Sequence, residues 1–229
     1  MTILLLETAT EVCSAAIARD GKIVASRRSD EPNAHSSLLA VFVDQMFAEI
    51  GMKASELNAV CVSSGPGSYT GLLIGVSTAK GLCYGLQIPL LSVPTLESMA
   101  MLYYSDHPEY QGMVCPMLDA RRMECYTMIA HKSSILRGTQ ADIIEPGIYD
   151  EWLDRGEVTF IGNGAAKTRD ILGVHPNARF DENFKIDCRG MLAEAERKLA
   201  AGLTEDVAYF EPFYLKDFVA KKSVVRGLR

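Results

Sequence analysis

Short apolar runs alternate with longer stretches of helical periodicity through the first hundred residues of the chain. Residues 2–6 form a continuous apolar run, which predicts a buried strand. Two more strands are expected at 12–19 and 22–28, because the Asp20-Gly21 pair between them is a strong hairpin signal. The chain therefore opens with three antiparallel strands.

Helices and strands alternate after this opening. Apolar residues recur at helical spacing or in short β-branched runs bounded by turn residues. These patterns predict helices at 37–50, 71–86 and 95–104, and strands at 59–62 and 88–93. Three meandering strands followed by strand–helix crossovers predict a mixed five-stranded sheet with helices packed on it. This α/β arrangement is one half of an actin-like or sugar-kinase-like (ASKHA) fold.

The second half of the chain echoes the first in abbreviated form. The polar, proline-containing segment 105–109 indicates a boundary between an N-terminal lobe, residues 1–105, and a smaller C-terminal lobe with a tail, residues 106–229. Beyond it, strands are expected at 112–118, 123–131, 135–137 and 158–161, and helices at 146–155, 165–172 and 187–201. We therefore expect a two-lobed protein whose second lobe is an abbreviated structural repeat.

A glycine-rich turn, residues 63–68, joins the expected strand at 59–62 to the helix that follows. Ser68 or Thr70 can cap that helix. A strand, a glycine-rich turn and a helix form the usual shape of a phosphate cradle. However, the turn lacks both the Gly-Lys-Ser/Thr of a P-loop and the spacing of a dinucleotide fingerprint. The alternative is a structural turn that lets the helix pack close to the sheet.

The helix at 71–86 is apolar or small almost all the way round, and Lys80 is its only charge. A surface helix needs an apolar stripe only about 100° wide. This helix is therefore either central to its lobe or shared with another protein. The helix at 37–50 is also more apolar than one core contact requires, with Leu38 and Phe42 flanking its natural inward stripe.

Composition narrows the function classes. The 229 residues are 48% hydrophobic, which is typical of a globular protein with a substantial core, and the net charge of −6 argues against unaided nucleic-acid binding. Six cysteines without a C-x-x-C pair indicate reduced core thiols in a cytoplasmic protein. No run of about 18 apolar residues predicts a membrane span. The basic tail from Lys216 to Arg229 is read as a solvated segment, with an RNA contact as the alternative.

Candidate chemistry is sparse in the first lobe. His35 begins the first long helix, but Leu39 stands one turn further on, where a second metal ligand would be needed. Glu7 ends the first strand, where kinases of this fold class hold a metal-organising carboxylate. The second half supplies no obvious partner carboxylate in a matching loop. We therefore predict no catalytic, metal-binding or cofactor-binding residues in this chain, and no cofactor.

The second lobe contains one charged cluster of interest. Asp119 and Glu124 flank the consecutive pair Arg121-Arg122. An internal salt bridge is the expected arrangement, and an anion-binding site is the alternative.

Several motifs, read together, closely resemble the TsaB (YeaZ) family, in order and spacing and over nearly the whole chain. They are Leu4-Leu5-Leu6-Glu7-Thr8-Ala9-Thr10 with Cys13-Ser14, His35-Ser36, Ser64-Gly65-Pro66-Gly67-Ser68-Tyr69-Thr70-Gly71-Leu72, Asp119-Ala120-Arg121-Arg122 and Pro212-Phe213-Tyr214-Leu215. The chain departs from the family's common pattern in having Glu7 and Ala9 in place of Asp and Ser, and Leu73 in place of arginine.

The resemblance implies an actin-like, two-lobed fold and a role in threonylcarbamoyladenosine modification of tRNA beside the anticodon. Members of that family are non-catalytic scaffolds that pair with a homologous catalytic subunit, TsaD, and are joined by an ATPase, TsaE. The resemblance thus implies a TsaD-like and a TsaE-like partner, tRNA contact only through the complex, and a homodimer in isolation. The catalytic relative holds metal with His-x-x-x-His on its first helix. Leu39 breaks that pattern here.

The resemblance also implies a surface, because family members join their first two helices to the partner's two in a four-helix bundle. The interface residues expected on this basis are Leu38, Phe42, Gln45, Leu73, Val76, Lys80 and Tyr84. The alternative for each is an ordinary core position. The competing functions are an active small ATPase or kinase of the same fold class, which would bind and turn over ATP, and a peptidase, which the Ser68 context disfavours.

Overall fold

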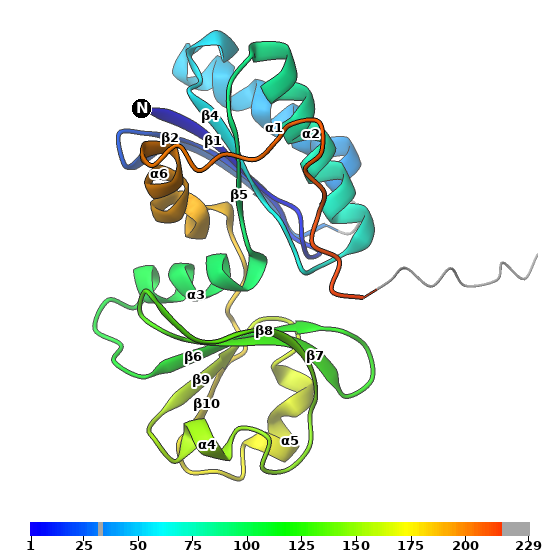
Figure 1. Cartoon of the computed structure of the whole chain (residues 1–229), viewed down its shortest axis with the longest axis vertical. Helices are drawn as coiled ribbons and strands as arrows, with labels where there is room; N and C mark the ends of the chain where they lie inside the picture. The colour runs from blue at the N-terminus through cyan, green and yellow to red at the C-terminus, as the bar shows by residue number, and fades with distance from the viewer. Residues whose placement is uncertain (32–33, 217–229) are drawn as a thin grey trace, which may run out of the picture.

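The computed structural model of the chain describes residues 1–31 and 34–216. These residues form two lobes, each built on a five-stranded sheet (Figure 1). No helix among the described residues is long and apolar enough to cross a membrane. All six cysteines are unpaired and buried, which confirms the prediction of reduced core thiols.

The first sheet has the strand order β3-β2-β1-β4-β5. Its strands are β1 (Thr2–Glu7), β2 (Cys13–Arg19), β3 (Lys22–Ser29), β4 (Ala59–Ser63) and β5 (Leu90–Val93). The first three strands are antiparallel, and β4 and β5 run parallel to β1. The predicted mixed five-stranded sheet is therefore confirmed.

The helices α1 (Ala34–Ile50) and α2 (Tyr69–Leu86) cover one face of this sheet. The other face is covered by a 3-10 turn at Cys188–Met191 and by α6 (Leu192–Ala200), whose core residues Cys188, Met191 and Ala195 pack among those of the sheet. In Figure 1 the two helical layers lie on opposite sides of the first sheet. Although α6 follows the second sheet in the sequence, it packs on the first lobe.

The second sheet repeats this topology with the order β10-β9-β6-β7-β8. Its strands are β6 (Met113–Asp119), β7 (Glu124–His131), β8 (Ser134–Ile143), β9 (Val158–Ile161) and β10 (Ala178–Asp181). The sequence predicts only the first four, because β10 is short and lies against the sheet edge with Arg179 and Asp181 among its four residues. The repeat is thus complete in its sheet and abbreviated in its helices.

Short helices α4 (Asp150–Leu153) and α5 (Arg169–Leu172) lie on one side of the second sheet. The longer α3 (Thr95–Asp106) lies on the other side, between the two sheets in Figure 1. Val12 of the first lobe joins this same cluster, so α3 connects the two cores.

Residues 203–216, which we call the C-terminal strap, return from α6 along the first lobe toward the second (Figure 1). Glu205 forms an antiparallel bridge with Leu90 on β5. Further along, Lys80 on α2 donates hydrogen bonds to the carbonyls of Ala208 and Phe210, at 3.1 and 3.0 Å. The strap therefore covers one flank of α2.

Candidate partner surface and interlobe cleft

The glycine-rich turn before α2 is a packing device. Ser68 caps the helix by accepting a hydrogen bond from the Gly71 N–H at 3.3 Å, and its own N–H donates to the carbonyl of Ala9 at 2.6 Å. A Cβ atom at Gly67 would lie 2.3 Å from that same carbonyl oxygen. The turn is thus occupied by the β1–β2 loop, which favours the structural reading over a phosphate cradle.

The inner glycines of α2 continue this close approach. A Cβ at Gly71 would meet the Thr8 carbonyl at 2.1 Å, and one at Gly75 would meet Thr8 Oγ1 at 2.2 Å. Both positions are buried. Their glycines let α2 rest directly on the end of β1, which offsets the roughly 1 kcal/mol that each glycine costs in a helix interior.

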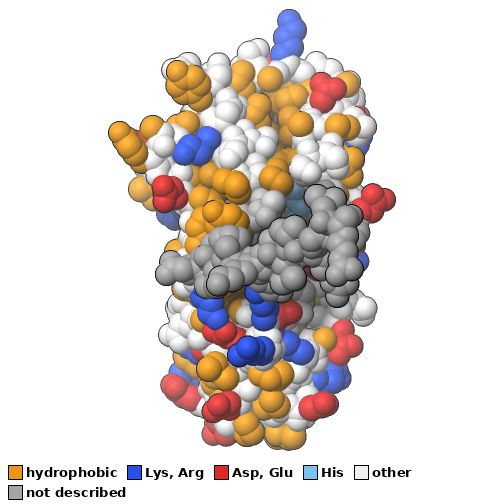
Figure 2. All heavy atoms as spheres, turned by 90° about the vertical axis from the view of Figure 1, so that its right-hand side faces the viewer, with side chains coloured by type: hydrophobic (Ala, Val, Ile, Leu, Met, Phe, Trp, Pro, Cys, Tyr) orange, Lys and Arg blue, Asp and Glu red, His pale blue; other side chains and the backbone are white. Residues whose placement is uncertain are grey.

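The outer glycines of α2 have no such explanation in the described part of the chain. A Cβ at Gly81 or Gly85 would meet nothing within 4 Å among the described residues, and both glycines are exposed. They share this outer face with Ser77 and with Leu73 and Tyr84, whose exposed fractions are 48% and 75%. This face is mostly apolar and is not covered by any other described segment, and in Figure 2 hydrophobic side chains gather over the first lobe.

The seven interface residues expected from the sequence divide into three groups in the isolated chain. Gln45, Leu73 and Tyr84 are exposed, Leu38 and Lys80 are half-buried, and Phe42 and Val76 are buried in the first-lobe core. Lys80 uses its ammonium group to hold the strap. The set stays a prediction, with Leu73 and Tyr84 as the residues best placed to reach a partner.

Sequence reasoning missed the outer stripe of Ser77, Gly81 and Gly85. The four-residue spacing of the α2 glycines is visible in the sequence, but it does not say which glycines face inward. That distinction depends on where the β1–β2 loop lies, and the sequence does not give this.

His35 is a packing residue in this structure. Its side chain is buried, and its Nε2 lies 3.2 Å from the Val12 carbonyl oxygen. One turn further along the helix, where a second metal ligand would be needed, the residue is the buried Leu39. The helix begins at Ala34, three residues before the start expected from the sequence, so Ser36 and Ser37 lie in its first turn. No cluster of three or more potential metal ligands occurs within residues 1–31 and 34–216.

Glu7 is fully buried at the end of β1, and its side chain does not line the cleft between the lobes. Its Oε1 accepts hydrogen bonds from the Ala9 N–H at 2.6 Å and from Ser63 Oγ at 2.8 Å, while Oε2 has no partner among the described residues. Burial raises the pKa of this carboxyl from 4.5 to about 7, against the lowering effect of these two bonds. The carboxylate is therefore not placed to organise a metal in the cleft.

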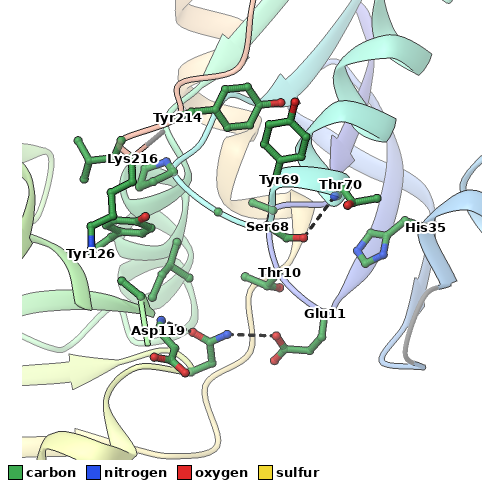
Figure 3. Close-up of a pocket in the computed structure, with 18 of the residues that line it drawn as sticks. Thr10, Glu11, His35, Ser68, Tyr69, Thr70, Asp119, Tyr126, Tyr214 and Lys216 are labelled. Carbon is green, nitrogen blue, oxygen red and sulfur yellow. Dashed lines mark hydrogen bonds between the residues drawn. The ribbon is translucent and has the colours of Figure 1, made fainter. Parts of the chain in front are cut away.

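A cleft of about 800 Å³ lies between the lobes (Figure 3). Thr10 and Glu11 come from the β1–β2 loop, Ser68 and Thr70 from the start of α2, and the strap contributes Tyr214, whose ring lies 4.7 Å from that of Tyr69. Glu11 Oε2 accepts a hydrogen bond from Asn163 Nδ2 across the cleft at 3.1 Å. The cleft is thus crossed by contacts between the two lobes.

The second-lobe wall of the cleft is charged. Asp119 Oδ1 lies 2.5 Å from Lys167 Nζ and accepts a hydrogen bond from the Arg121 N–H at 2.8 Å. Although partial burial opposes it, this pairing holds the pKa of Asp119 below its usual range. Lys216 of the strap pairs in turn with Glu124. The prediction of a salt bridge between these two carboxylates and the Arg121-Arg122 pair is wrong, because both carboxylates form ion pairs with lysines from other segments.

Comparisons with known proteins agree with this architecture. The family of tRNA N6-adenosine threonylcarbamoyltransferase, TsaD, matches residues 29–224. The tRNA threonylcarbamoyladenosine biosynthesis protein TsaB of Escherichia coli is 31% identical over 231 residues, which cover 98% of each chain.

Solved structures give the same result. YeaZ from Pseudomonas aeruginosa superposes with a TM-score of 0.83 at 26% identity, over 93% of this chain and 99% of that one. A component of the (R)-2-hydroxyglutaryl-CoA dehydratase of Acidaminococcus fermentans shares the fold alone, with a TM-score of 0.51 at 11% identity, over 89% of this chain and 100% of that one. The chain has the predicted actin-like fold and belongs to the TsaB (YeaZ) family of tRNA threonylcarbamoyladenosine biosynthesis proteins.

Proposed function

We propose that this protein is a non-catalytic subunit for threonylcarbamoyladenosine modification of tRNA, and that it acts by pairing with a homologous TsaD-like catalytic subunit. The outer face of α2, together with the exposed side of α1, is the pairing surface. A TsaE-like ATPase joins the pair, tRNA is bound by the complex, and the chain forms a homodimer when the catalytic subunit is absent. The site of action is the cytoplasm.

The observation that carries this proposal is the pair Gly81 and Gly85. Glycine destabilises a helix interior, and natural helices keep it where another backbone approaches closely. Among residues 1–31 and 34–216, nothing lies within 4 Å of a Cβ placed at either residue. A partner helix packed on this face explains both glycines, and the exposed Leu73 and Tyr84 beside them supply apolar contact area.

The absence of a catalytic role is supported by three local features. The position one turn after His35 is a buried leucine, the carboxylate of Glu7 is fully buried and does not line the cleft, and the glycine-rich turn is filled by the β1–β2 loop. A small ATPase or kinase would need such groups to face a bound nucleotide and metal. None of these observations favours that alternative.

Size-exclusion chromatography with the TsaD-like subunit of the same organism tests the pairing. The wild-type chain co-elutes as a heterodimer, and Leu73→Glu abolishes co-elution because it buries an unpaired charge at the centre of the interface. The matched control is Ile135→Glu on β8 of the second lobe, where the wild-type side chain is equally exposed at 50%. Both variants keep the melting temperature of the wild type. Co-elution of Leu73→Glu with undiminished affinity would reject the α2 surface.

A further inference from the structure

The turn between β6 and β7 places two consecutive arginines at the surface of the second lobe. Arg121 and Arg122 are both exposed, and Arg121 lines the interlobe cleft. Both have positive φ angles, 73° and 51°, in the left-handed region that glycine and asparagine adopt at least cost. The requirements of the turn therefore do not explain why arginine stands at either position.

Neither guanidinium group takes part in an ion pair in the described part of the chain, although the charge of Arg121 acts on Asp119. The two neighbouring carboxylates are paired with lysines, Asp119 with Lys167 and Glu124 with Lys216. Among residues 1–31 and 34–216, neither Arg121 nor Arg122 has an ion-pair partner, although 15 ion pairs are present elsewhere. As far as residues 1–31 and 34–216 are concerned, two strongly basic groups are thus available to an anion from outside the chain.

Two lysines lie near these arginines, because Lys216 lines the same cleft as Arg121 and Lys167 pairs with Asp119 at the end of β6. In Figure 2 several Lys and Arg side chains gather on the second lobe beside its boundary with the first. The chain as a whole carries a net charge of −6. An acidic protein with a small basic region binds a polyanion weakly alone and contributes a few contacts within a larger assembly.

We infer that Arg121 and Arg122 contact the phosphate backbone of tRNA in the assembled complex. The inference rests on the proposed function and adds to it a surface for the nucleic acid. The planar guanidinium group matches phosphate oxygens with two parallel N–H donors. Contacts of this kind fix the position of the RNA without reading its sequence. The surface lies on the second lobe, so tRNA and the partner subunit use different parts of the chain.

The test uses the complex reconstituted from the full chain and the TsaD-like subunit, with tRNA binding followed by fluorescence anisotropy at increasing salt. The variant Arg121→Asn with Arg122→Asn removes both charges and retains a residue type suited to positive φ. The expected result is an affinity about 10-fold weaker at low salt and a salt dependence smaller by about two counterions. Arg121→Lys with Arg122→Lys retains the salt dependence.

The matched control removes two charges from other hairpins, Lys22→Asn with Lys132→Asn. Both lysines are exposed, and Lys132 also has a positive φ, of 53°. This control leaves affinity and salt dependence unchanged. Equal tRNA binding by the arginine variant and the wild type, with pairing intact, would overturn the inference and leave the proposed function standing.

Two other outcomes also overturn the inference. If the arginine variant loses co-elution with the TsaD-like subunit, the arginines contact protein and not RNA. If the wild-type chain fails to pair at all, the proposed function falls and the inference falls with it. Size-exclusion chromatography before each titration separates these two results.

Discussion

Glu7 shows how burial decides the chemistry of a single residue. At the end of β1 its sequence position suggests a metal-organising carboxylate, but the side chain is fully buried and hydrogen-bonded to its own loop. Because burial raises the pKa of the carboxyl to about 7, the protonated form predominates in the folded state below about pH 7. Glu7 therefore stabilises the β1–β2 loop as a neutral group and weakens the fold when it is charged.

This pKa predicts how stability changes with pH. Between pH 4.5 and about 7 the folded state binds more protons at Glu7 than the unfolded state, so the contribution present at lower pH is lost as pH rises through this range. Glu7→Gln cannot ionise, so the variant does not lose this stability as pH rises. Above pH 7 its free energy of unfolding is therefore higher than that of the wild type by roughly 3 kcal/mol. At pH 5 the difference is small.

Urea unfolding at pH 5 and pH 8 measures both values, with Glu109→Gln as the control substitution at an exposed position. A Glu7→Gln variant that is less stable than wild type at pH 8 would show that Glu7 is charged and stabilising in the fold.

Val76 and Leu73 lie on the same helix, but Val76 belongs to the core and Leu73 to the surface. The Val76 side chain is only 3% exposed and packs in the first-lobe core, whereas Leu73, three residues earlier, is 48% exposed. Val76→Glu therefore buries an unpaired carboxylate and lowers the free energy of unfolding by about 3 kcal/mol or more. Chemical denaturation compares it with Leu73→Glu, which stays within about 0.5 kcal/mol of wild type. Equal stability of the two variants would mean that Val76 is not a core residue.

At the scale of elements, α2 carries two glycine stripes with opposite roles. Gly71 and Gly75 accommodate the β1–β2 loop, whereas a Cβ at Gly81 or Gly85 would have no described neighbour within 4 Å. The sequence predicts the helix itself and its Ser68 cap correctly, because these depend on local periodicity and turn chemistry. It does not distinguish the two stripes, because each glycine is assigned by the segment that packs against it.

Substitution by alanine gives a matched pair within this one helix. Gly81→Ala raises the free energy of unfolding of the isolated chain by up to about 1 kcal/mol, because alanine is the better helix former and its Cβ meets no described atom within 4 Å. The same change weakens pairing with the TsaD-like subunit. Gly75→Ala lowers stability, because its Cβ would meet Thr8 Oγ1. Thermal unfolding measures the stability of each variant, and calorimetric titration measures its affinity for the TsaD-like subunit. Tighter binding of Gly81→Ala to that subunit would contradict a close helix–helix contact.

At the scale of the whole molecule, the chain returns to its first lobe after completing its second. The two-lobed fold and the repeat of the sheet can be predicted, because the periodicity of apolar residues indicates the order of strands and helices. The location of α6 cannot be predicted in this way. Its amphipathic pattern would fit any apolar surface, and the helix packs on the face of the first sheet that α1 and α2 leave open. The role of Lys80 is equally non-local, since its partners Ala208 and Phe210 lie more than a hundred residues further along the chain.

The burial of all six cysteines makes one direct measurement of the partner surface possible. Burial raises the pKa of each native thiol, to about 11 for Cys83, so a cysteine introduced at the surface reacts selectively with a maleimide. Tyr84→Cys places such a thiol on the outer face of α2, and Val174→Cys places one on the second lobe, where the wild-type side chain is 81% exposed.

Maleimide labelling of these two variants, at a concentration where the isolated chain sediments as a monomer, tests the central claim that α2 is the surface for the catalytic homologue. The account predicts that adding the TsaD-like subunit slows labelling at position 84 at least about 10-fold and leaves position 174 unchanged, because a packed interface excludes water and solute. Unchanged labelling at position 84 in a complex that has demonstrably formed would contradict it.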